Sequence, residues 1–183
     1  MLKPFCRSQI FLVSLITAAL HSGCGVLVGN VKPTTEHDEQ YHLMDIAAEE
    51  PGWKLLSPPS SSSDESHSDV AYQSEKTASI ISLTSACGKG PETESNDLKH
   101  YTDLLLMGFN STESKTERAL QLGRQDALET TVEGTMNHEP TRVRTVVLKK
   151  DLCVYDLMYI SRPVNFSVHE NLFSRFVNSF RPR

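Results

Sequence analysis

The sequence predicts a mixed α/β (α+β) fold with a mostly antiparallel sheet and an amphipathic helix at the C-terminus. Four strand-like segments between residues 117 and 160 follow one another with short polar connections, as in an antiparallel meander. Residues 167–180 carry apolar side chains at helical spacing. Because such a helix must bury its apolar face, we expect it to pack on the sheet.

The first 24 residues have the composition of an export signal that ends at a cysteine. Lys3 and Arg7 precede an apolar run of 11 residues, 10–20, and small residues then precede Cys24. The run is too short to span a bilayer but suits a signal peptide. The ending resembles a bacterial lipobox, whose cysteine is acylated, although His21 departs from that pattern. We predict a signal peptide over 1–23 and lipidation of Cys24, with simple secretion or a buried core helix as alternatives.

Residues 24–50 are predicted to comprise the lipidated cysteine and a flexible polar tether, because few of them are apolar. The acyl chains on Cys24 would tie the protein to a membrane. Gly25 follows Cys24 in place of an inner-membrane retention Asp. This favours an outer-membrane lipoprotein of the cell envelope that faces the periplasm, with the inner membrane or the cell surface as alternatives.

The charge balance argues against nucleic acid as a partner. Removal of Lys3 and Arg7 with the signal leaves 16 basic residues against 23 acidic ones, a net charge of −7. Binding to phosphates requires a basic face. We therefore expect a protein partner in the envelope.

Cys87 and Cys153 are the two cysteines that remain in the mature domain. An even pair in an exported protein favours a disulfide, and two buried thiols are the alternative. A redox role would require an exposed thiolate, which apolar strands do not favour. No C-x-x-C or paired Cys/His spacing is present, so we expect no metal site and no cofactor.

The domain is predicted to span residues 51–183 and to begin with a short strand at Trp53. A proline- and serine-rich loop, 58–66, follows this strand. A helix is expected from about Asp97 to Met107, capped by Ser95 or Asn96. The expected later strands are 70–73, 79–87, 117–122, 127–134, 142–148 and 152–160, with a hairpin connection at 137–140.

The C-terminal helix is predicted to begin at a capping box, Ser167-Val168-His169-Glu170. Its expected apolar face consists of Val168, Leu172, Phe173, Phe176, Val177 and Phe180.

Asp156 interrupts an apolar face of the expected central strand 152–160. A buried carboxylate requires a partner or a raised pKa. One interpretation is a polar floor to a ligand pocket, lined also by Tyr155, Tyr159 and Tyr101. The other is an ion pair with Arg142, Arg144 or Arg162, or a position at the open end of the sheet.

The opening Pro51-Gly52-Trp53 and the closing Phe173-x-x-Phe176-Val177-x-Ser179-Phe180 resemble the PsbP-like superfamily. That group includes photosystem II accessory proteins, a Ran-binding factor and DcrB-type envelope lipoproteins. The resemblance implies an α/β/α sandwich, with helices on both faces of an antiparallel sheet, and a role as a binding or accessory module.

No catalytic motif is present in the sequence. We therefore expect a non-enzymatic, lipid-anchored extracytoplasmic binding module. The alternative is a periplasmic carrier that holds a small apolar ligand between the sheet and a helix.

Overall fold

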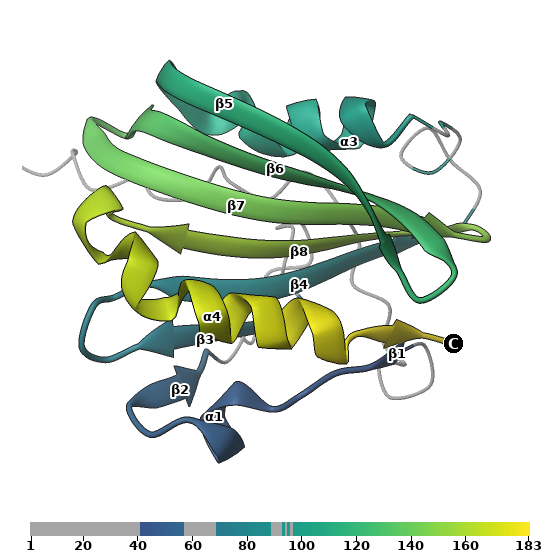
Figure 1. The fold of residues 1–183 in the computed structure, drawn as a ribbon, viewed down its shortest axis with the longest axis horizontal. Helices are drawn as coiled ribbons and strands as arrows, with labels where there is room; N and C mark the ends of the chain where they lie inside the picture. The colour runs from purple at the N-terminus through teal and green to yellow at the C-terminus, as the bar shows by residue number, and fades with distance from the viewer. Residues whose placement is uncertain (1–40, 57–68, 89–92, 94, 96) are drawn as a thin grey trace, which may run out of the picture.

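The computed structural model describes residues 41–56, 69–88, 93, 95 and 97–183, which form an antiparallel sheet with a helix on each face (Figure 1). The sheet has seven strands in the order β2-β3-β4-β8-β7-β6-β5, and a separate two-stranded sheet joins β1 to β9. In chain order the elements are β1 (Tyr41–His42), α1 (Ile46–Glu49), β2 (Trp53–Leu55), β3 (Val70–Ser74), β4 (Ile80–Cys87), α3 (Leu98–Leu105), the 3-10 turn η2 (Leu106–Gly108), β5 (Phe109–Leu122), β6 (Gln125–Met136), β7 (Glu139–Lys150), β8 (Cys153–Ser161), α4 (Pro163–Ser179) and β9 (Arg181–Pro182).

Helix α4 covers one face of the sheet and completes the main core. Phe173 and Phe176 are fully buried against strand residues such as Ile81, Leu83 and Leu157. Trp53 of β2 meets the ring of His169 on α4 edge to face, with 5.0 Å between the ring centres. The first and last parts of the domain therefore share one core.

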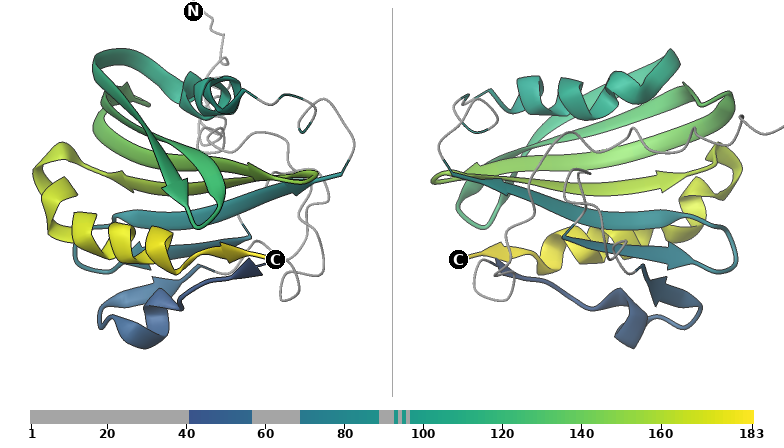
Figure 2. Two further views of the ribbon diagram at one scale, coloured as in Figure 1. Left: turned by 45° about the vertical axis from the view of Figure 1, so that its right-hand side comes forward. Right: turned by 180° about the vertical axis from the view of Figure 1, so that it is seen from behind.

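Helix α3 lies on the opposite face, which is visible from behind in Figure 2. Tyr101 packs there with Val147 and Val154, and Leu105 with Val143 and Met158. The two helix layers confirm the predicted α+β class and the α/β/α sandwich that the resemblance implied.

The expected strand and helix positions agree with the structure where the sequence alternates clearly. Two-residue turns join β5 to β6 and β6 to β7, the second at Asn137-His138 inside the predicted hairpin connection. Asn137 and His138 both have positive φ, which suits the right-handed twist of a tight hairpin.

The helix expected over 97–107 is present. Its N-cap is Asp97 rather than Ser95 or Asn96, because the Asp97 carboxylate accepts a hydrogen bond from the amide of Lys99.

Residues 41–50 differ from the expected tether. Ile46 is fully buried in the main core, and the Asp45 carboxylate caps α1 by accepting from the amides of Ala47 and Ala48. The amide of Met44 donates to the Ser179 hydroxyl on α4 at 3.1 Å. Residues 41–50 therefore belong to the folded domain. The sequence did not indicate this, because the elements there are too short to show a periodic pattern.

Two boundaries were predicted wrongly. Strand β5 begins at Phe109 and not at Glu117. The sequence did not reveal this earlier start, because residues 110–119 are exposed on both faces and therefore show no alternation of apolar and polar residues. Helix α4 begins at Pro163, so Ser167 lies inside it and the capping box is not formed. Proline suits a first helical position because its missing N–H has no partner there. Val168, expected on the apolar face, is 57% exposed.

The predicted signal peptide 1–23, Cys24, the tether as far as residue 40 and the loop 58–66 lie outside the described residues. Within the described part of the chain, no helix has the length and apolar character needed to cross a bilayer.

Candidate functional site

The four residues of the predicted pocket lie on opposite faces of β8. Tyr155 and Tyr159 point toward α4 and belong to the main core. Asp156 alternates with them and points to the other face, where α3 carries Tyr101. The structure therefore brings Asp156 and Tyr101 to one side and the other two tyrosines to the opposite side, so the four do not share a pocket.

Tyr159 is held by packing and by one hydrogen bond. Its ring centre is 4.7 Å from that of Phe166 and 5.8 Å from that of Phe173. Its hydroxyl donates to the Phe166 carbonyl at 2.8 Å. These contacts account for the tyrosine as a core residue.

Asp156 does not pair with the arginines that the sequence offered. Arg144 donates to Glu129 through Nε and Nη2, the latter at 2.6 Å. The other two form ion pairs with different carboxylates, Arg142 with Glu133 at 3.5 Å and Arg162 with Glu139 at 3.4 Å.

Burial instead raises the pKa of Asp156 to about 7, with a smaller contribution from the carboxylate of Asp69. Its Oδ1 atom is buried and forms no hydrogen bond with any residue that the structure describes. A neutral carboxyl avoids most of the cost of burying a charge.

Two buried hydroxyls lie on the same face as Asp156. Thr130 of β6 and Thr145 of β7 are directly opposite each other. Thr145 is two residues before Val147, the residue of β7 that pairs with Asp156. Neither hydroxyl finds a hydrogen-bond partner within the described ranges. Sequence reasoning missed these threonines because threonine is an ordinary strand residue.

A cavity of about 400 Å³ lies where Tyr41, the first described residue, meets the C-terminal Arg183. Tyr72 of β3 forms part of its wall, and its pKa is raised to about 12 by burial and by the neighbouring Asp45 carboxylate. The cavity combines apolar walls with acidic and basic groups, so it suits a polar or charged group of a partner. The lining residues are Tyr41, His42, Leu43, Met44, Asp45, Asp69, Val70, Tyr72 and Arg183.

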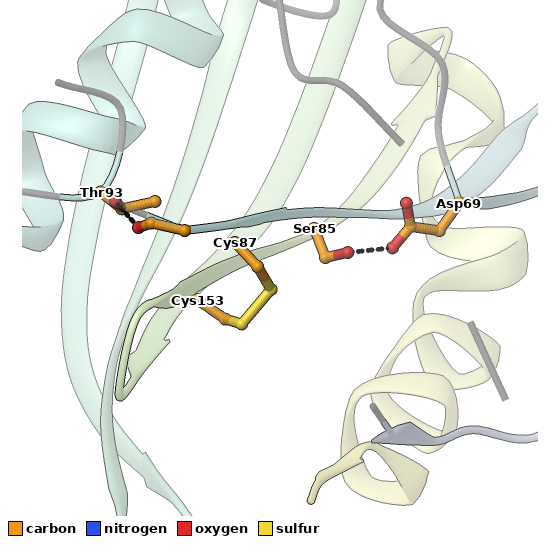
Figure 3. Close-up of a disulfide and its surroundings, with 6 residues drawn as sticks. Asp69, Ser85, Cys87, Thr93 and Cys153 are labelled. Atoms are coloured by element: carbon orange, nitrogen blue, oxygen red, sulfur yellow. Dashed lines mark hydrogen bonds between the residues drawn. A yellow bond between two sulfur atoms is a disulfide. The ribbon is translucent and has the colours of Figure 1, made fainter. Parts of the chain in front are cut away.

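Asp69 connects this cavity to the disulfide region (Figure 3). The Ser85 hydroxyl donates to the Asp69 carboxylate, and two residues further along β4 a disulfide joins Cys87 to Cys153. Cys87 and Cys153 are direct neighbours in the register of β4 and β8. The bond therefore ties β4 to β8.

The described residues contain no group of three or more His, Cys, Asp or Glu side chains placed to hold a metal ion.

No protein-family model and no curated protein matches this chain. Solved structures do match it. The cyanobacterial PsbP protein CyanoP from Synechocystis sp. PCC 6803 aligns with a TM-score of 0.52 at 12% identity, over 91% of this chain and 100% of that chain. LpqN, involved in cell envelope biogenesis of Mycobacterium tuberculosis, aligns with a TM-score of 0.50 at 12% identity, over 80% of this chain and 87% of that chain.

A Pseudomonas aeruginosa protein of unknown function aligns less closely, with a TM-score of 0.44 at 13% identity over 72% of this chain and 83% of that chain. At such identities a match concerns the fold alone. The CyanoP and LpqN matches confirm the PsbP-like fold that the opening and closing motifs indicated.

Proposed function

We propose that this protein is a non-catalytic accessory module of the bacterial cell envelope, anchored through acyl chains on Cys24. The observation that carries the proposal is the PsbP-like fold shared with LpqN, a protein of envelope biogenesis, and the predicted export signal over residues 1–23 supports it. The match to CyanoP extends over nearly the whole chain and supports the same architecture.

The acyl chains are the membrane contact in this proposal. The chain that remains after removal of the signal has a net charge of −7. Such a surface is repelled by anionic lipid headgroups. Two or more acyl chains hold a protein stably without help from its surface, whereas one holds it only marginally.

The cavity is the partner-binding site in this proposal. Tyr41, at the start of the described domain, lines it together with Arg183 at the end of the chain. The cavity is thus next to the point where the polypeptide from Cys24 enters the domain. The carboxylates of Asp45 and Asp69 and the guanidinium of Arg183 all line the cavity, so charged groups of both signs lie at this site.

The alternative of an apolar-ligand carrier receives less support. Its ligand would occupy the space between the sheet and α4, where Tyr159, Phe166 and Phe173 contact one another and are buried. An apolar ligand would have to displace these core contacts.

The first test replaces the proposed lipid site, Cys24. The measurement is the intact mass of the full chain after expression in a bacterial host. We expect the wild-type protein in the membrane fraction, starting at Cys24 and carrying acyl mass. The Cys24→Ala variant should lose the acyl mass and leave the membrane. The matched control is Cys6→Ala, which changes a cysteine within the predicted signal and should leave the mature mass unchanged. A wild-type chain without acyl mass in the soluble fraction would contradict the anchor.

A further inference from the structure

Strand β5 forms one edge of the seven-stranded sheet and is its longest strand, with 14 residues. Among the described strands it pairs with β6 alone, so its outer edge faces away from the sheet (Figure 1). The residues from Asn110 to Ala119 are all exposed. An edge of this length presents a row of backbone donors and acceptors to a further strand.

Proteins commonly protect such edges with bulges and charges, and β5 has both in part. Its register to β6 is irregular between Phe109 and Ser111 and between Thr112 and Ser114. From Ser114 to Leu122 every residue has a partner on β6 without interruption. The protective bulges are therefore confined to the first part of the strand, and the second part has regular geometry.

The charges on the regular part alternate in sign. Lys115 and Glu117 lie on the same face of β5, with 2.9 Å between Nζ and Oε1. Helix α3 adds one charge of each sign, since Asp103 contacts Lys115 at 2.8 Å and Lys99 contacts Glu117 at 3.2 Å. A run of one sign would repel a second copy of the strand, whereas this cluster is balanced and allows a register in which opposite charges face each other.

We propose that β5 pairs antiparallel with β5 of a second copy of this chain, about a two-fold axis at Thr116. In that register Lys115 lies opposite Glu117 of the second copy, and the same contact occurs twice by symmetry. The two sheets join edge to edge into one.

Neighbouring registers are less favourable. An axis at Lys115 or at Glu117 places two like charges opposite each other, which is destabilising. An axis at Ser114 brings Lys115 opposite Glu113 but runs the new ladder across the irregular segment between Thr112 and Ser114. The axis at Thr116 alone combines opposite charges with the regular part of β5.

The first test is a charge exchange, with sedimentation of the purified full chain as the measurement. Lys115→Glu alone, or Glu117→Lys alone, places like charges opposite each other twice per dimer. Each should weaken dimerisation by about tenfold or more. The double exchange restores opposite charges and should recover most of the wild-type affinity. Circular dichroism of each variant separates weaker pairing from loss of fold.

The second test is disulfide trapping on a non-reducing gel. Residue 116 of one copy faces residue 116 of the other, about 5 Å away, so Thr116→Cys should yield a covalent dimer. The matched control is Arg118→Cys, whose two copies are offset by four residues, about 13 Å, beyond the reach of a disulfide. The wild-type lane reports any dimer formed through the native cysteines.

Three results would overturn the proposal. The first is a protein that stays monomeric at all concentrations, with no trapping at position 116. The second is a dimer whose affinity does not change with the charge exchanges and which cross-links equally at positions 116 and 118. That result would place the contact elsewhere. The third is a strand of another protein trapped at position 116 in place of a second copy.

Discussion

At the scale of single residues, Asp156 has the most unusual environment. It occupies a central strand, its Oδ1 atom is buried without a hydrogen bond to the described residues, and its pKa is raised from 3.8 to about 7. Between these two values the native protein keeps a proton that the unfolded chain releases. The native state therefore binds more protons, and its stability falls as the pH rises through this window.

We expect the Asp156→Asn variant to lack this pH dependence, because an amide stays neutral in both states. Relative to wild type, its free energy of unfolding should increase by about 2–3 kcal/mol between pH 5 and pH 8, at about 1.4 kcal/mol per tenfold change in proton affinity. Urea unfolding at the two pH values measures this difference. Asp126→Asn, at an exposed position, should track wild type. Parallel behaviour of wild type and the Asp156→Asn variant would mean that the carboxyl is ionised in the native state.

At the scale of elements, α4 illustrates how a good sequence pattern can mark the wrong position. Ser167 and Glu170 have the spacing of a capping box, yet the helix begins four residues earlier at Pro163. Tyr159 helps to set this start, because its hydroxyl binds the carbonyl of Phe166 inside the first two turns. A contact with β8 thus supports the first turns of the helix, and the local sequence does not contain this contact.

The two possible starts of α4 predict opposite effects for Ser167→Ala. Removal of an N-cap serine costs about 0.5–2 kcal/mol. At an exposed position inside a helix, the same change gains up to about 0.5 kcal/mol, since alanine is the better helix former. We expect a neutral or stabilising effect in urea unfolding. Phe173→Ala, which opens a cavity in the core, should cost about 3–5 kcal/mol and shows that the assay reports on α4. A clear loss for Ser167→Ala would favour the later start.

At the scale of the whole molecule, the two ends of the described chain hold each other in place. Strand β1 pairs with β9, so Tyr41 and His42 lie beside Pro182 and Arg181. Arg175 of α4 contacts Glu50 at 2.5 Å and Glu49 at 3.4 Å. The cavity is formed at this junction, and residues from both ends of the described chain line it.

Ile46→Ala tests whether residues 41–50 belong to the domain. Ile46 is fully buried in the main core, so we expect a loss of about 2–4 kcal/mol in the free energy of unfolding. Ala48→Ser, on the exposed side of α1, serves as the control and should change stability by less than about 0.7 kcal/mol. An unchanged stability for Ile46→Ala would restore the earlier interpretation of a flexible tether up to residue 50.

The sequence by itself determined the α+β class, the central strands and the amphipathic C-terminal helix. These features depend on periodic burial, which alternating residues such as Ile81, Leu83, Tyr155 and Leu157 record directly. The motifs around Trp53 and Phe173–Phe180 also indicated the PsbP-like fold, which the structural matches confirm.

Only the tertiary structure decided the packing of residues 41–50 on the domain, the first turn of α4, the extent of β5 and the candidate site. Each depends on contacts between residues far apart in the chain, or on segments too short or too exposed to carry a period. The sequence singled out Asp156 as a polar residue in an apolar strand. It could not predict that the three candidate arginines pair with other carboxylates. The cavity brings Tyr41 and Arg183 together from the two ends of the described chain, and no local pattern records that proximity.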